Sequence, residues 1–402
     1  MAEQSVPVAR PKRLDSLTGL RFLAAFHVVL FHLTSGFVQR MPSPIAGVLR
    51  EGPESVTIFF ILSGFVLAYT YRDRAAHHPA PFWWARVARI YPVYLLTLAL
   101  ALPMFLGHPQ QYDEIQLDTA RVSMGAFFNT HFIAGLACIF LLQAWLPPAV
   151  LKWNYPGWSL SAEAFFYLLF PRLSSLIASQ SPNKLRRVAI IAWLASISMA
   201  AGWWAISWQL PPEPILHAWW GDVLQFNPLI RLPEFVIGMA IGFRFMDGPV
   251  PGRADRSAAV AVLTIIGIWA IHWSEASSHF ENSLLLPVYA SLVLSLAYEQ
   301  GRLARFLASP KMVELGHASY ALYLVHAPII FLAQRLAPAR EAGTGYVRAG
   351  LEVVLTALVA VLVSLWMYRW VEEPARRAIR HWAARRESSA VAAAALNQPP
   401  RA

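Results

Sequence analysis

Ten runs of about twenty mostly apolar residues recur along this 402-residue chain. A helix needs about 20 apolar residues to cross the hydrocarbon core of a bilayer. Backbone polar groups in lipid must be satisfied within the protein, so runs of this kind form helices. A soluble protein with buried helices would need polar helix faces, which these runs lack. The sequence therefore predicts an all-α fold, a polytopic integral membrane bundle of about ten transmembrane helices.

The distribution of Arg and Lys predicts which side of the membrane each loop faces. Basic residues gather in alternate loops and in the C-terminal tail, which is typical of cytoplasmic segments. An eleventh candidate run, 123–146, is interrupted by polar residues, and counting it would place the basic tail outside. We therefore expect cytoplasmic N- and C-termini and a re-entrant or interfacial segment at 123–146. The ten predicted spans are 17–38, 54–71, 88–106, 158–178, 187–207, 229–247, 257–273, 282–299, 313–336 and 347–371.

The pattern divides the chain into a cytoplasmic N-terminal tail at 1–14, a membrane domain at 15–377 and a C-terminal tail at 378–402. The basic start resembles a signal peptide, but no small-residue cleavage pattern follows and the first run is long enough to span, so we expect a retained first helix. The C-terminal tail is rich in Ala and Ser, ends in Pro-Pro, and is predicted to be disordered.

Composition narrows the possible functions. The formal net charge is +10, but the basic residues lie between apolar runs, so membrane topology explains them and no nucleic-acid partner is expected. The single cysteine, Cys138, excludes an intrachain disulfide and a cysteine metal cluster. The spacing of the other possible ligands offers no plausible zinc set, so no metal is expected.

Arg21 and His32 lie inside the first apolar run, where ionisable side chains are expensive. Eleven residues at about 100° each return to within about 20° of the starting direction, so both share one helix face, roughly 16 Å apart along the axis. A histidine can take a proton from a hydroxyl nucleophile near neutral pH. A histidine that only packs between helices is an equally good interpretation. His27 lies about 140° from His32, and we expect it to be structural.

Two further patterns place charge near helix starts. Arg86 and Arg89 share a face at the start of the third span. Two guanidiniums there suit the phosphates of a nucleotide cofactor, although topology-setting charge alone would explain them more simply. Glu163 falls about one turn inside the fourth span, with Tyr167 one turn further on the same face. A carboxylate at that depth needs a partner, and stabilisation by the helix N-terminus is the structural alternative.

A polar stripe runs along the ninth span, where Ser319, Tyr323 and His326 follow an i, i+4, i+7 pattern. A polar seam between helices explains it as well as substrate contact does. The outer loop 208–228 carries residues that could stack on sugar rings, although ordinary interfacial anchoring explains them slightly better. These residues are Trp208, His217, Trp219, Trp220 and Asp222. Segment 368–377 is interpreted as a cytoplasmic helix end and not as a site.

Six motifs in order resemble the membrane-bound acyltransferase-3 family. Each motif alone is weak, but their order and spacing hold from about residue 15 to residue 377, nearly the whole chain. The motifs are Arg21-x10-His32, Phe59-Phe60-Ile61-Leu62-Ser63-Gly64-Phe65, Arg86-x-x-Arg89-x-Tyr91-Pro92, Trp158-Ser-Leu-x-x-Glu163-x-x-Phe166-Tyr167, Ser319-Tyr320-x-x-Tyr323-Leu-x-His326 and Glu373-Pro374.

The resemblance implies an O-acyltransferase that moves an acyl group, usually acetyl from acetyl-CoA, onto a hydroxyl of a glycan, lipid-linked sugar or small natural product. It also implies that Arg21 and His32 are the essential pair and that Arg86 and Arg89 bind the acyl donor. We expect Tyr91 to join this donor site. Acyl-CoA would be a co-substrate and not a permanently bound cofactor.

A mechanism consistent with both lines of reasoning uses His32 as the general base, oriented by Glu163. Arg21 would hold the donor or stabilise developing negative charge. A covalent acyl-histidine intermediate is not excluded by the sequence. The remaining candidates for substrate contact are Trp158, Ser161, Tyr167, Ser319, Tyr320, Tyr323 and His326.

Two other classes of function stay open. A transporter or flippase would use the intramembrane Arg, His and Glu as a substrate or proton path. A non-catalytic membrane scaffold in a polysaccharide-assembly complex would tolerate replacement of His32 and Glu163. For the enzyme we expect a multi-pass protein of the inner (cytoplasmic) membrane. The acceptor, the acyl chain and the oligomeric state are left open.

Overall fold

A computed structural model describes residues 13–72, 79–107, 124–207, 221–247, 254–271, 278–336 and 346–396. Within these ranges the secondary structure is helical throughout, without a strand. Six helices are long and apolar enough to cross a membrane, or seven when a pair bent by 78°, Asn282–Ala297 with Gly301–Leu307, counts as one span. The predicted all-α, multi-span class is confirmed at this level. The number ten and the orientation of the termini stay predictions.

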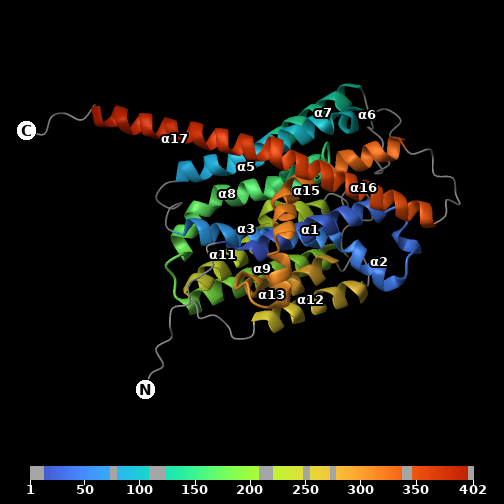
Figure 1. The fold of residues 1–402 in the computed structure, drawn as a ribbon, viewed down its shortest axis with the longest axis horizontal. Helices are drawn as coiled ribbons and strands as arrows, with labels where there is room; N and C mark the ends of the chain where they lie inside the picture. Colours follow the sequence, from blue (N-terminus) through green and yellow to red (C-terminus); the bar gives the residue numbers. More distant parts are fainter. Residues whose placement is uncertain are drawn as a thin grey trace, which may run out of the picture.

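The helices form one bundle with α1 and α3 at its centre (Figure 1). The α-helices are α1 (Asp15–Thr34), α2 (Ser43–Arg50), α3 (Ser55–Tyr71), α5 (Pro79–Leu100), α6 (Leu102–Gly107), α7 (Met124–Ile139), α8 (Trp158–Ile177), α9 (Pro182–Ser207), α11 (Pro228–Asp247), α12 (Ala254–Ile271), α13 (Ser278–Ala297), α14 (Gly301–Leu307), α15 (Pro310–Leu336), α16 (Tyr346–Met367) and α17 (Glu373–Leu396). Short 3₁₀ turns are η1 (Val38–Arg40), η2 (Gly52–Glu54), η3 (Gln143–Trp145), η4 (Pro147–Ala149) and η5 (Tyr155–Gly157), and η6 (Tyr368–Glu372) is a π-helical turn.

Glycines let the central helices approach one another closely. A Cβ added at Gly64 of α3 would lie 2.1 Å from the carbonyl oxygen of Phe235 in α11. A Cβ at Gly316 of α15 would lie 2.0 Å from the carbonyl oxygen of Thr18 in α1. Both distances are impossible for a real side chain, so only glycine permits these contacts. Small residues at such crossings are how membrane helices gain packing energy without a hydrophobic driving force. Gly64, part of a family motif, therefore serves packing.

The segment 123–146 is not one continuous helix in its described part. Helix α7 has 16 residues and then breaks, with Leu141 at a positive φ of 57°. Gln143, one of the polar residues that interrupt the apolar run, is buried and donates to the Gly157 carbonyl oxygen at 2.8 Å. The break is consistent with a segment that does not span, since a helix of this length is shorter than the roughly 20 residues required. Its depth in a membrane stays a prediction.

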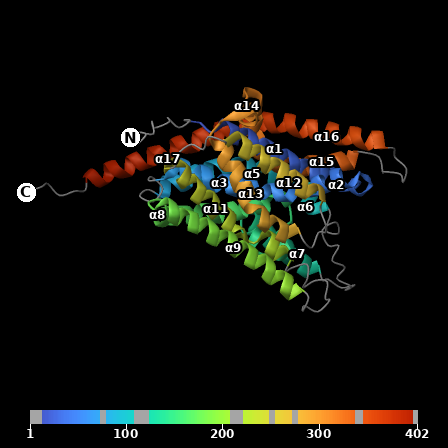
Figure 2. The ribbon, with the colours of Figure 1, turned by 90° about the horizontal axis from the view of Figure 1, so that it is seen from below.

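The C-terminal region differs from the prediction of a disordered tail at 378–402. Helix α17 continues to Leu396, and residues 397–402 lie outside the described ranges, as do 1–12 of the N-terminal tail. Ala and Arg are the most frequent residues of this stretch, and their high helix propensities explain the helix. Helix α17 runs beside α5 and then projects beyond the bundle (Figures 1 and 2). Trp382 of α17 meets Trp84 of α5 edge to face, with ring centroids 5.1 Å apart.

Candidate functional site: two cavities that meet at Tyr323

Four arginines face one cavity of about 290 Å³, which we call the arginine cavity. Arg21 comes from α1, Arg86 and Arg89 from α5, and Arg380 from α17. A single carboxylate, that of Glu163, is the acidic group among the described lining residues. The cavity therefore carries excess positive charge in a low-dielectric setting, which suits an anionic ligand. The other lining residues used below are Tyr71, Val56, Phe59, Ser63, Ser159, Tyr167, Ser319, Tyr320 and Tyr323.

The arginines differ in how they are held. Arg86 donates from Nη2 to the hydroxyl of Tyr71 at 3.0 Å, and its guanidinium lies 5.3 Å from the centre of that ring. Arg21 and Arg89 donate no hydrogen bond to another described residue, although Glu163 attracts both electrostatically. Arg86 is thus fixed in place before a ligand arrives, while the N–H groups of Arg21 and Arg89 are available to it.

Glu163 sits at the end of a hydrogen-bond chain across the arginine cavity. The Tyr167 hydroxyl donates to its Oε2 at 3.0 Å, and Ser63 donates to the Tyr167 hydroxyl at 3.2 Å. The predicted i, i+4 pairing of Glu163 and Tyr167 is present. The predicted contact between Glu163 and His32 is wrong, because Glu163 lies among the arginines and His32 lines a different cavity. A carboxylate buried in a helix bundle settles against the nearest cations, which here are guanidiniums.

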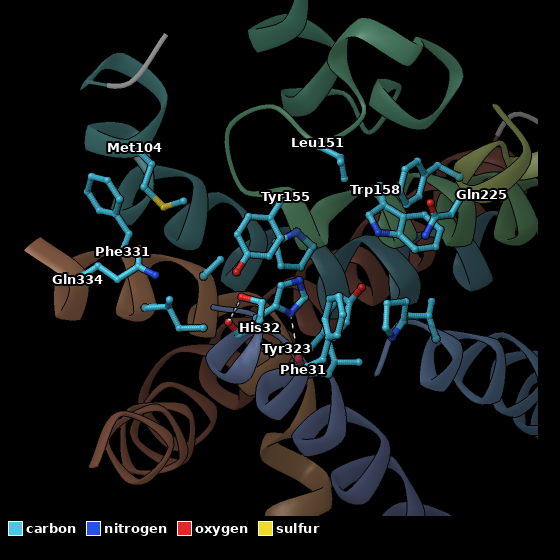
Figure 3. A pocket seen from close by; sticks show the side chains of 18 residues that line it. Phe31, His32, Met104, Leu151, Tyr155, Trp158, Gln225, Tyr323, Phe331 and Gln334 are labelled. Atoms are coloured by element: carbon cyan, nitrogen blue, oxygen red, sulfur yellow. Dashed lines mark hydrogen bonds between the residues drawn. The ribbon is translucent and has the colours of Figure 1, made fainter. Parts of the chain in front are cut away.

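His32 lines a second cavity of about 490 Å³, which we call the histidine cavity. Figure 3 shows its ring between Tyr155 and Tyr323, with Trp158 along the same wall. Nδ1 lies 2.9 Å from the carbonyl oxygen of Val28, one turn back on α1. A carbonyl oxygen only accepts, so Nδ1 carries the proton and Nε2 of the neutral ring has a free lone pair. This is the tautomer that a general base requires.

The two cavities meet at Val56 and Tyr323, which line both. The Tyr323 hydroxyl accepts a hydrogen bond from Ser159 at 2.9 Å, and its ring lies 5.9 Å from that of Phe59. Arg21 and His32 therefore do share one face of α1, but they open into neighbouring chambers with Tyr323 between them.

Other predicted contacts with substrate divide into two groups. Trp158 lines the histidine cavity, and Tyr167, Ser319 and Tyr320 line the arginine cavity. The Tyr320 hydroxyl also donates to the Ile90 carbonyl oxygen at 2.7 Å, which ties α15 to α5.

Three predicted site residues line neither cavity. Ser161 is fully buried and donates to the Leu141 carbonyl oxygen at 2.6 Å, so it fastens the broken segment after α7. Tyr91 contacts Tyr94 edge to face instead of the cavity. His326 lies behind His32, with ring centroids 5.0 Å apart and zero exposure. The i, i+7 spacing correctly placed His326 on the same face of α15 as Ser319. Along the helix, however, that face turns from the cavity into the core of the bundle.

His27 has the structural role expected of it. Its two ring nitrogens pair with the Ser55 hydroxyl at 2.8 Å and the Val48 carbonyl oxygen at 2.7 Å, and its ring stacks on Trp269. Of the outer-loop candidates, Trp208, His217, Trp219 and Trp220 lie outside the described residues. Asp222 is described, and it lines neither cavity.

Sequence reasoning missed several lining residues. Tyr155 precedes the predicted motif at Trp158, and Tyr71 ends the second span, so both were close to a signal without carrying one. Ser159 belongs to that motif but was not among the predicted site residues. Arg380 lies in the predicted tail, where nothing distinguished it from topology-setting charge. Glu372 is also buried and interacts electrostatically with Arg89. The π-helical turn η6 provides it, and such turns often occur at functional sites.

No group of three His, Cys, Asp or Glu side chains that could hold a metal ion occurs in the described part of the chain. The residues best arranged to hold a cofactor-like ligand are the arginines of the arginine cavity, which present guanidinium donors to phosphate-like groups.

The chain is similar in sequence to several known acyltransferases. The chain is 30% identical over 386 residues to Acyltransferase MdmB of Streptomyces mycarofaciens, covering 92% of this chain and 93% of that protein. It is 25% identical over 390 residues to O-acetyltransferase OatA of Staphylococcus aureus and 23% identical over 380 residues to peptidoglycan O-acetyltransferase OatA of Listeria monocytogenes. These matches cover 91% of this chain but 58% and 56% of those two proteins, so the chain spans little more than half of their length.

No solved structure matches the chain. The acyltransferase domain that defines the acyltransferase-3 family matches residues 14–369, nearly the whole membrane bundle and every cavity arginine except Arg380. The chain belongs to the acyltransferase-3 family.

Proposed function

We propose that this chain is an integral membrane O-acyltransferase that moves an acyl group, most simply acetyl, from acyl-CoA in the arginine cavity to a hydroxyl compound in the histidine cavity. The observation that carries the proposal is the meeting of two chemically different cavities at Val56 and Tyr323. One is suited to a polyanion, and the other presents a histidine with a free basic nitrogen.

The donor side of the proposal rests on the arginines. CoA carries three phosphate groups, and guanidiniums form charge-assisted, often bidentate hydrogen bonds to phosphate. Arg86, already held by Tyr71, would anchor one group, while Arg21 and Arg89 would close on others. Glu163 offsets part of the positive charge when the cavity is empty. The pantetheine arm would then extend along α1 toward His32.

The acceptor side of the proposal rests on the His32 tautomer. Nε2 takes the proton of the acceptor hydroxyl as its oxygen attacks the thioester carbonyl carbon. The new C–O bond forms, the C–S bond breaks, and the thiolate leaves with the bonding electron pair. The imidazolium returns the proton to that thiolate, so the products are the ester and CoA thiol. Arg21, the arginine of α1, would hold the donor or stabilise negative charge that develops at the thioester oxygen.

The same proposal sets an orientation. In this proposal the chain crosses the inner membrane ten times and both termini lie in the cytoplasm. The arginine cavity then lies toward the cytoplasm, where acyl-CoA is made. His32 then lies toward the opposite side, and the acceptor would enter there or from the membrane.

The test uses purified protein in lipid nanodiscs, with acetyl-CoA labelled in the acetyl group and a lipid and glycan extract of the host as acceptor. We expect CoA thiol release and transfer of label to an extract component, both lost in His32→Gln. A folded His32→Gln variant with undiminished transfer would overturn the base assignment. Release of no thiol by the wild-type protein would overturn the donor assignment, and a transporter would move its cargo without transferring label.

A further inference from the structure

His32 must become positively charged during the proposed reaction, and its own cavity offers that charge little support. An imidazolium in a low-dielectric site is costly unless partners accept its N–H groups. Nδ1 is already bonded to the Val28 carbonyl oxygen at 2.9 Å, so the proton taken up on Nε2 is the one that needs a partner. None of the described residues that line the histidine cavity is Asp or Glu, and Glu163 lines the other cavity. The partner must therefore be a neutral acceptor.

His326 is a titratable side chain in the right place for this role. Its ring centroid lies 5.0 Å from that of His32, with the two ring planes inclined by 41°. The side chain is completely buried on α15 and lines neither cavity, so it adjoins the base without reaching the substrate. Any effect of His326 on the reaction must therefore act through His32.

The ring nitrogens of His326 are both unused. Neither forms a hydrogen bond with a described residue, although both are buried. The Leu322 and Tyr323 carbonyl groups, about one turn back on α15, act on the ring but accept no regular hydrogen bond from it. A neutral imidazole has one N–H donor and one lone pair. Native folds rarely leave such groups buried without partners, and a catalytic role is one of the few explanations for an exception. One nitrogen of His326 is thus available as an acceptor.

Three titratable rings face His326 from the elements around it. They are His32 from α1, Tyr155 from η5 and Tyr323 from α15 itself, with ring centroids at 5.0, 5.9 and 6.1 Å. The Tyr323 hydroxyl is already engaged with Ser159. Among the described residues no Asp, Glu, Lys or Arg acts on His326 electrostatically. His32 is therefore the neighbour whose change of charge this ring can sense.

We propose that His326 is a positioning residue for His32, and that one of its ring nitrogens accepts a hydrogen bond from Nε2 of His32 after Nε2 has taken the proton of the acceptor hydroxyl. A tilt of the two rings brings a nitrogen of one within hydrogen-bond distance of the other. The imidazolium keeps its proton until the C–S bond breaks, and the proton then passes from Nε2 to the thiolate. His326 gains and loses no proton over the cycle. The inference rests on the proposed function and adds the group that stabilises the charged base.

The first experiment measures kcat against pH for acetyl transfer in nanodiscs, with the wild-type protein and three variants. His326→Leu removes the acceptor nitrogens, whereas His326→Asn and His326→Gln each place an amide oxygen near one of their positions. Without its partner the His32 imidazolium is less stable, so His32 stays neutral to lower pH. In His326→Leu we expect the acid limb of the profile to move down by about one to two pH units. Its maximal kcat should fall roughly 3- to 30-fold, because a weaker base accepts protons more slowly.

At least one of the two amide variants should recover part of both effects. If His326 only fills space, the variants would lose kcat or melting temperature while the acid limb stays in place, and that result would overturn the inference. The proposed function fails separately, by undiminished transfer in His32→Gln. His317→Leu is the control, because His317 lies on the same helix, stacks on Tyr368 and lines neither cavity. Its acid limb should coincide with that of the wild-type protein.

The second experiment needs no variant of His326 and remains decisive if those variants do not fold. Val325–His326 is the only Val-His pair in the sequence, so carbonyl-labelled valine with isotope-labelled histidine assigns His326 by solid-state NMR of the wild-type protein. As the pH is lowered and His32 is protonated, we expect one ring nitrogen of His326 to shift toward the value of a hydrogen-bonded acceptor. The response should be absent in His32→Gln. A His326 signal that does not depend on His32 would refute the partnership.

Discussion

Ser159 donates a hydrogen bond to the hydroxyl of Tyr323 at 2.9 Å, joining α8 to α15 where the two cavities meet. The bond holds a bulky ring between a chamber lined by arginines and a chamber that contains His32. In the proposed transfer, an acyl group that moves between the chambers would pass beside this ring. We therefore expect the pair to influence how far the chambers communicate.

Replacing Tyr323 tests that control. Tyr323→Ala should connect the cavities and admit water, so acetyl-CoA hydrolysis should rise relative to transfer. Tyr323→Phe retains the ring and loses only the hydrogen bond to Ser159, so its ratio of acetyl-CoA hydrolysis to acyl transfer should stay near the wild-type value. Thiol release and acetylated product, measured in the same reaction, give the ratio. An unchanged ratio in a folded Tyr323→Ala variant would show that the ring does not separate donor from water.

His32 and His27 form a matched pair on α1. His32→Gln should reduce kcat by roughly 10²- to 10⁴-fold, the usual contribution of a general base, with little change in KM for acetyl-CoA. His27→Gln should instead lower the melting temperature, because His27 holds Ser55 and the Val48 carbonyl, while kcat changes little. Steady-state kinetics and thermal unfolding of both variants make the comparison. A loss of kcat confined to the His27 variant would reverse these assignments.

Arg86 should bind the donor as a pre-positioned cation. Arg86→Ala should raise KM for acetyl-CoA roughly tenfold or more, since a hydrogen bond to a charged group contributes about 1.5–3 kcal/mol. Arg86→Lys should recover only part of this, because an ammonium lacks the planar fork. Tyr71→Phe removes the hydroxyl that Arg86 contacts and should have a smaller effect of the same sign. Equal KM values for acetyl-CoA in the wild-type protein and these three variants would exclude donor binding by Arg86.

Arg380 lines the arginine cavity although it lies beyond the part of the chain that matches the family. Arg380→Ala should raise KM for acetyl-CoA about 2- to 5-fold, the size expected of an exposed charge, and the effect should shrink at high salt. Arg377→Ala is the control, because Arg377 lies on the same helix, pairs with Glu373 at 2.8 Å and lines neither cavity. If both variants behaved alike, general attraction by α17 would explain the effect without a specific contact.

Much of the site was predictable where spacing along one helix decides the geometry. Arg86 with Arg89 and Glu163 with Tyr167 depend only on helical periodicity, and each pair lines one cavity as expected. Ser161, Tyr91 and His326 line neither cavity, because periodicity gives a face but not what covers that face. Ser161 faces the Leu141 carbonyl, which belongs to an irregular turn that no period predicts.

The sequence by itself determined the class of the protein. Long apolar runs require membrane helices, and six ordered motifs place the chain in its family, since both are properties of local composition and spacing. Tertiary structure alone decided that Glu163 joins the arginines and not His32, that Arg380 enters the arginine cavity, and that His32 lines a separate cavity. These relationships depend on how separate helices pack, and packing between distant segments leaves no local pattern in the chain.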